Sequence, residues 1–128
     1  MNRLFVETIL ETYGLYPTII FEDDLDVKAK FIPEEDKLIM KRVSNKNTEP
    51  KDFFITVLHE AKHMLDARRL GISKFLKKYA QAGTVAVYCD KDYHDDNKWE
   101  IKAEKWAHKE FNNYWVGDGK KSEGLSDS

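Results

Sequence analysis

Two histidines stand four residues apart near the middle of the chain, in the run His59-Glu60-Ala61-Lys62-His63. Residues at this spacing lie on one face of an α-helix, so two imidazoles can bind a single Zn²⁺ ion. A glutamate directly after the first histidine is typical of the general base in zinc hydrolases. The pattern predicts a zinc site with His59 and His63 as metal ligands and Glu60 as the catalytic residue.

The helix that carries this motif has two different faces. At about 100° per residue, one side collects the apolar residues Phe54, Leu58, Ala61 and Leu65. His59, His63 and Asp66 fall on the opposite side, which makes Asp66 a candidate to hydrogen-bond a ligand histidine from behind. An isolated pair of histidines on a polar face is commonly only solvated. Here the flanking sequence is apolar enough to cover both sides of the helix, which favours the metal interpretation.

A catalytic zinc needs a third protein ligand and an open fourth position. The last helical segment offers Glu100, Glu104 and His108 along one stripe. Glu100 lies closest to the apolar arc of that segment, and a buried carboxylate needs a partner such as a metal. We therefore expect Glu100 to be the third ligand. Glu104, one turn later, suits an acceptor for the free N–H of a ligand histidine, although it could instead pair with neighbouring lysines.

A zinc hydrolase that cleaves a carbonyl compound also needs a group that stabilises the oxyanion of the transition state. Tyr88, Tyr93 and His94 are the candidates, in or beside the acidic loop that precedes Glu100. A packed tyrosine or a solvated histidine is the alternative for each, and His94 is also an alternative metal ligand. The single cysteine, Cys89, excludes disulfides within the chain and is more typical of a small hydrophobic residue than of a zinc ligand.

Periodicity predicts the elements that must position these residues. The first half reads as a helix followed by a β-strand and a β-hairpin: residues 2–13, 17–21, and the strands 26–32 and 37–43. Thr48 is the predicted N-cap of the motif helix, which ends before Gly71. The second half reads as a helix over 72–81 stopped at Gly83, a short strand over 85–88, an acidic loop and a helix over 98–114.

This order predicts an α+β fold in a single domain. The expected architecture is a small antiparallel or mixed sheet of about three strands, packed on the motif helix and on a C-terminal helix that carries the glutamates. The domain is expected to span residues 1–116. Residues 117–128 are rich in glycine and charge and are expected to form a disordered tail.

Two runs carry a resemblance to a known family, residues 56–63 (TVLHEAKH) and residues 100–107 (EIKAEKWA). The chain resembles the ImmA/IrrE family of zinc metallopeptidases, in which an H-E-x-x-H helix is followed by an E-x-x-A-x-x-F-A helix. The resemblance implies a gluzincin-like zincin fold, Zn²⁺ as cofactor, the second helix as source of the glutamate ligand, and hydrolysis of a peptide bond. It also implies an origin in a phage or another mobile element and a regulatory protein, such as a repressor, as substrate.

Two departures from the family pattern are visible. Lys62 stands where the family usually has glycine or another small residue, and Trp106 stands where it often has phenylalanine. With 128 residues, the chain is not expected to carry the helix-turn-helix domain of some family members. Any link to DNA would then run through a protein substrate or partner.

Charge and hydropathy limit the other function classes. The chain has 21 Lys+Arg and 23 Asp+Glu, so direct nucleic-acid binding is not expected. No apolar run is long enough for a membrane span and the start of the chain does not resemble a signal peptide, so a cytoplasmic protein is expected. Two alternatives to an active peptidase stay open: a catalytically silent zincin-like module that binds a partner protein, and a domain that carries the motif by coincidence.

Overall fold

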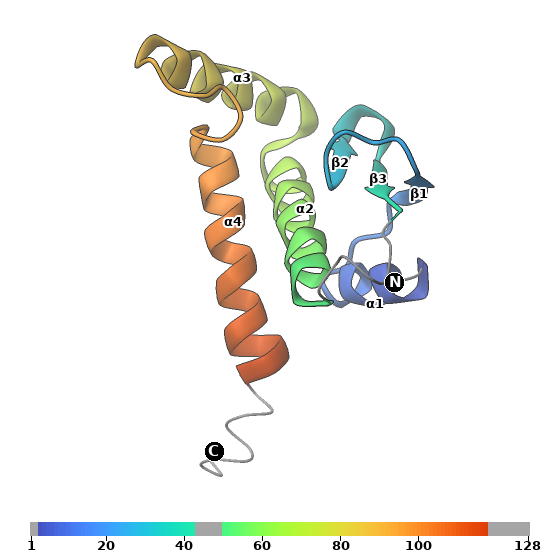
Figure 1. The fold of residues 1–128 in the computed structure, drawn as a ribbon. Helices are drawn as coiled ribbons and strands as arrows, with labels where there is room; N and C mark the ends of the chain where they lie inside the picture. The colour runs from blue at the N-terminus through green and yellow to red at the C-terminus, as the bar shows by residue number, and fades with distance from the viewer. Residues whose placement is uncertain (1–2, 43–49, 118–128) are drawn as a thin grey trace.

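The computed structural model describes residues 3–42 and 50–117. In chain order the elements are α1 (Arg3–Thr12), β1 (Thr18–Glu22), β2 (Ala29–Ile32), the 3-10 turn η1 (Pro33–Glu35), β3 (Lys37–Lys41), α2 (Pro50–Leu70), α3 (Ile72–Tyr88), α4 (Lys98–Glu110) and the π-helical segment η2 (Phe111–Val116). Within these residues, four α-helices and one small sheet form a single α+β domain, as the sequence predicts (Figure 1).

The sheet is mixed and has the strand order β1-β3-β2. β3 pairs in parallel with β1 and antiparallel with β2, so the predicted hairpin is confirmed. The first strand of the hairpin is shorter than the predicted 26–32 and begins only at Ala29. β3 ends at Lys41, whose N–H donates to the Lys28 carbonyl just before β2 begins. In the strand order of the described residues, β2 lies at one edge of the sheet.

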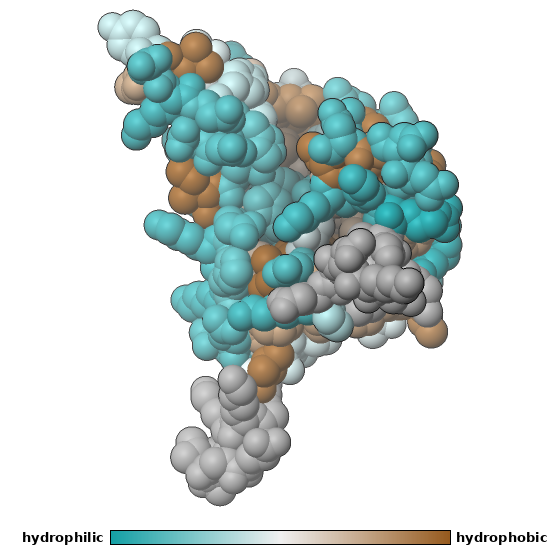
Figure 2. All heavy atoms as spheres, viewed as in Figure 1, coloured by the Kyte–Doolittle hydropathy of each residue, from teal (hydrophilic) through white to brown (hydrophobic). Residues whose placement is uncertain are grey.

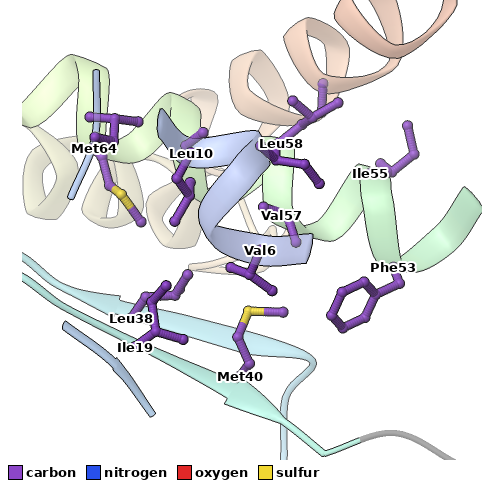
Figure 3. Packing of buried hydrophobic residues seen from close by; sticks show 14 residues of the cluster. Val6, Leu10, Ile19, Leu38, Met40, Phe53, Ile55, Val57, Leu58 and Met64 are labelled. Carbon is purple, nitrogen blue, oxygen red and sulfur yellow. The ribbon is translucent and has the colours of Figure 1, made fainter. Parts of the chain in front are cut away.

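The hydrophobic core lies between α1, one face of the sheet and α2 (Figure 3). Leu38 and Met40 alternate along β3 and are fully enclosed, as strand periodicity requires. Val57 of α2 and Val6 of α1 lie over Met40, and Leu58 of α2 belongs to the same buried cluster (Figure 3). This packing fixes the position of α2 against the sheet.

Helix α2 lies between the sheet and α4 (Figure 1). Its two faces are both covered, as the flanking apolar sequence indicates. The helix ends at Leu70, and Gly71 follows with a φ of +91°, a conformation that favours glycine. The predicted N-cap, Thr48, lies outside the described residues.

The sequence interpretation of α3 is wrong in its second half. The helix does not stop at Gly83, and residues 85–88 are helical instead of forming a strand. Gly83 is buried against the ring of Tyr93, and a Cβ atom there would lie 2.5 Å from Tyr93 Cε2. Glycine therefore permits a close approach between α3 and the loop that follows it, and does not end the helix.

Helix α4 begins at a well-defined cap. The Asn97 side chain accepts a hydrogen bond from the Trp99 N–H at 2.9 Å and donates one to the Tyr79 carbonyl at 3.0 Å. Helical geometry continues through η2, which agrees with the predicted helix over 98–114. Apart from Gly117, the predicted tail over 117–128 lies outside the described residues.

Hydrophilic residues cover most of the face shown in Figure 2. This agrees with a charged fraction of 34% in the sequence. Among the residues that the structure describes, no helix combines the length and apolarity needed to cross a membrane.

The contact between Gly83 and Tyr93 generates a stability prediction. We expect Gly83→Ala to destabilise the protein by about 1–3 kcal/mol, because the added methyl group must displace the Tyr93 ring. In a Tyr93→Ala background the same change should instead stabilise by up to about 1 kcal/mol, since alanine is the better helix former. Urea unfolding of the unmodified protein, the two single variants and the double variant measures both effects. An equal effect of Gly83→Ala in both backgrounds would contradict the prediction.

Candidate metal centre

Helices α2 and α4 bring three potential ligand atoms together. His59 Nε2 lies 2.7 Å from Glu100 Oε1, and His63 Nε2 lies 3.0 Å from the same oxygen. The three atoms lie within 4.8 Å of one another. His59 and His63 occupy one face of α2 because they are four residues apart, and Glu100 is in the first turn of α4. The predicted ligand set is thus assembled, close enough to bind a metal ion.

The spacing of the donor atoms is close to that of a zinc site. In a tetrahedral site with ligands at 2.0–2.1 Å from the ion, neighbouring ligand atoms lie about 3.3 Å apart. The two distances to Glu100 Oε1 are shorter than this by a few tenths of an ångström, as expected for hydrogen bonds. A small separation of the three side chains converts the cluster into a metal-binding geometry. The residues present therefore fit a zinc ion.

Burial makes the charges of this cluster interdependent. Burial alone raises the pKa of Glu100, but hydrogen bonds from His59 and His63 outweigh it and hold that pKa well below its usual range. Burial lowers the pKa of His59, yet the hydrogen bond to Glu100 and the charges of Glu60 and Glu100 raise it to about 9. Without metal, the site therefore holds an imidazolium beside a carboxylate.

Glu60 lies beside the ligands and is only 8% exposed. Burial raises its pKa, and the charge of Glu100 acts in the same direction, whereas the charges of His63, His59 and His94 lower it. A carboxylate with a raised pKa binds a proton more readily near neutral pH than an exposed glutamate does.

Glu104 stands behind His59, on the side away from Glu100. Its Oε1 accepts a hydrogen bond from His59 Nδ1 at 2.8 Å, and its Oε2 is 3.0 Å from His108 Nε2. Hydrogen bonds of this kind fix the orientation of a ligand imidazole. The structure therefore brings Glu104 to the place expected of an outer partner of the first histidine.

Asp66 is buried on α2, but its hydrogen bonds go to residues other than the two ligand histidines. Its Oδ1 accepts hydrogen bonds from Lys62 at 2.9 Å and Arg69 at 3.3 Å. Asp66 Oδ2 and His63 Nδ1 are both buried and have no hydrogen-bond partner within the described part of the chain. The carboxylate therefore balances the charge of Lys62.

The candidates from the acidic loop separate into two groups. His94 reaches the cluster, with Nε2 3.2 Å from Glu100 Oε2. Tyr93 packs its ring on Gly83 instead, and Tyr88 is 90% exposed at the end of α3. Cys89 is exposed and lines a separate hollow between α3 and α4. The structure does not bring these last three side chains to the ligand atoms.

The sequence patterns did not indicate two residues of the site, Tyr79 and Asn97. Tyr79 donates a hydrogen bond from its hydroxyl group to Glu100 Oε2 at 2.5 Å, and Asn97 joins α3 to the start of α4. Burial and the bond to Glu100 raise the pKa of Tyr79, which keeps its hydroxyl protonated. Its position four residues after Phe75, on the apolar face of α3, was the available signal, since a buried tyrosine hydroxyl needs a partner.

Two cavities meet at the cluster, one on each side. The first, of about 390 Å³, is lined by apolar side chains from β2 and α3, including Phe31, Phe75 and Leu76. The second, of about 440 Å³, is more polar and extends past His59 and Glu104. Both are lined by Glu60, His94 and the β2 residue Ala29. The two cavities therefore adjoin beside the ligand residues, next to the start of β2.

The chain matches no family model, and comparisons with curated proteins and with solved structures give no significant match.

The cluster predicts metal-dependent stability. We expect zinc at 100 times its Kd to stabilise the protein by about 2.7 kcal/mol, because the ion binds only the folded arrangement of ligands. His63→Ala should abolish this gain, and Cys89→Ala, which removes a sulfur outside the cluster, should retain it. Thermal unfolding with zinc and with chelator measures the effect. Loss of the zinc-dependent gain in Cys89→Ala would contradict the ligand assignment.

The raised pKa of His59 predicts a pH dependence with a defined sign. The pKa of His59 is about 9 in the folded protein and 6.5 for an ordinary histidine. The contribution of protonated His59 to the free energy of unfolding is therefore complete below pH 6.5 and is lost as the pH rises through 9. Metal binding at pH 7.5 must remove this proton. Calorimetry in two buffers of different ionisation enthalpy should report close to one proton released per zinc bound. Equal binding heats in the two buffers would contradict this protonation state.

Proposed function

We propose that this protein is a zinc-dependent metalloendopeptidase that hydrolyses a peptide bond in a protein substrate. The observation that carries the proposal is the convergence of His59, His63 and Glu100 beside the buried carboxyl group of Glu60. Two imidazoles and one carboxylate form a three-residue set that leaves one coordination position open, as catalytic zinc sites require.

The residues have distinct roles in this mechanism. His59, His63 and Glu100 would hold the zinc ion, which would supply a Lewis acid that activates water and polarises the scissile carbonyl group. Glu60 accepts the proton of the attacking water and delivers it to the leaving amine. Its buried position supports this role, since burial raises its pKa. His94, at the junction of the two cavities, is the candidate to stabilise the oxyanion.

A polypeptide substrate is supported by the shape of the site. Glu60 lines both cavities, so an extended chain that occupies the two would pass directly over the site. β2 pairs only with β3 among the described strands, so its outer edge is available to bind an extended segment. The resemblance to the ImmA/IrrE family favours a regulatory protein such as a repressor as substrate, in the cytoplasm of a phage-infected or mobile-element host.

Replacement of the base tests the activity. We expect Glu60→Gln to lower the rate of peptide hydrolysis about 10²–10⁴-fold, since a positioned general base contributes that much. Zinc content should stay near that of the unmodified protein, because Glu60 is not in the ligand set. The assay is cleavage of a proteome-derived peptide library by the zinc-loaded protein, read by mass spectrometry.

The control is Glu11→Gln, which makes the same chemical change at an exposed position of α1 and should leave cleavage unchanged. Zinc-loaded protein that cleaves no library peptide and no host repressor would overturn the peptidase proposal. If that protein still binds a repressor, and Glu60→Gln binds it equally well, the catalytically silent binding module is the better description.

A further inference from the structure

The two carboxylate oxygens of Glu100 have different partners. Oε1 faces both ligand histidines, at 2.7 Å from His59 Nε2 and 3.0 Å from His63 Nε2. Oε2 accepts a hydrogen bond from the Tyr79 hydroxyl at 2.5 Å and lies 3.2 Å from His94 Nε2. One oxygen is thus directed at the metal position, and the other is held on the opposite side.

We propose that Tyr79 is a positioning residue that restricts Glu100 to binding the metal through Oε1 alone. The proposal rests on the proposed zinc site. It assigns to Tyr79 the task of keeping a coordination position open, which a carboxylate bound through both oxygens would occupy. A hydrolytic site needs that position for water or for the substrate carbonyl.

Three contacts hold Tyr79 in place for this task. Its ring packs against Phe75 at 6.2 Å and against the ring of His63 at 6.3 Å between centroids. Its backbone carbonyl accepts the hydrogen bond from Asn97. Because Asn97 caps the helix whose first turn carries Glu100, the tyrosine and the glutamate are tied to one another through backbone as well as side chain.

His94 is the weaker of the two partners of Oε2. Its side chain is 63% exposed, and its distance to the oxygen is longer. Nδ1 of the same ring is 3.1 Å from Asp95, so the imidazole is shared with the solvent-exposed loop. The Tyr79 hydroxyl is half-buried and donates to a single acceptor. Removal of this hydroxyl is therefore the change that frees Oε2.

The test is the coordination of Co²⁺ and Zn²⁺ in Tyr79→Phe, which removes the hydroxyl and keeps the ring. Four-coordinate Co²⁺ absorbs visible light strongly, and five- or six-coordinate Co²⁺ absorbs weakly. We expect a four-coordinate spectrum for the unmodified protein and weaker absorption for Tyr79→Phe, as Glu100 turns both oxygens to the ion. Zinc affinity should fall about 10–100-fold, as is typical for outer partners of metal ligands.

The matched control is Tyr93→Phe, the same change on the neighbouring ring, which lies 6.4 Å from that of Tyr79. Its hydroxyl has no hydrogen bond to the ligands among the described residues, so its Co²⁺ spectrum should equal that of the unmodified protein. Thermal unfolding without metal should confirm that both variants fold.

The outcomes separate this proposal from the peptidase proposal. An unchanged Co²⁺ spectrum in Tyr79→Phe overturns the positioning role and leaves the metal site intact. A reduced cleavage rate with an unchanged spectrum also overturns it, because the hydroxyl would then act on the substrate. If the unmodified protein binds neither Co²⁺ nor Zn²⁺, the zinc site and the role of Tyr79 fail together.

Discussion

Glu100 is a carboxylate enclosed between two helices, and its negative charge has to be balanced where water has little access. Leaving such a charge without a partner costs several kcal/mol. Here the balance comes from His59 and His63 across the interface of α2 and α4, with Tyr79 on the remaining oxygen. The interface can close only if these groups meet, so the polar cluster and the helix packing depend on each other.

The covering of α2 on both faces follows from this constraint. The face with Val57 and Leu58 packs on the sheet and α1, which supplies the apolar burial for the domain. The face with His59 and His63 is shielded by α4 and α3. A histidine pair on a helix with one exposed face would be solvated and weakly ordered. Enclosure between two layers restricts the imidazoles to orientations in which both Nε2 atoms point to the same oxygen.

Local patterns predicted the elements well where one physical cause dominated. Apolar periodicity located α1, α2 and α4, and alternation located the hairpin. The failure at Gly83 has a tertiary cause. The residue is a helix breaker by propensity, at a cost of about 1 kcal/mol relative to alanine, but the contact with Tyr93 requires the absence of a side chain. Propensity alone does not distinguish a glycine that ends a helix from one that permits close packing.

The sequence by itself identified the two histidine ligands of the site, because the spacing of His59 and His63 places them on one face of any α-helix. It also indicated Glu100, since an acidic residue beside an apolar arc is drawn inward. Only the tertiary structure decided that Tyr79, 21 positions earlier, meets that carboxylate and that Tyr88 does not approach it. Such contacts depend on how α3 crosses α4, which is set by the packing of the whole domain. Local periodicity carries no information about that crossing.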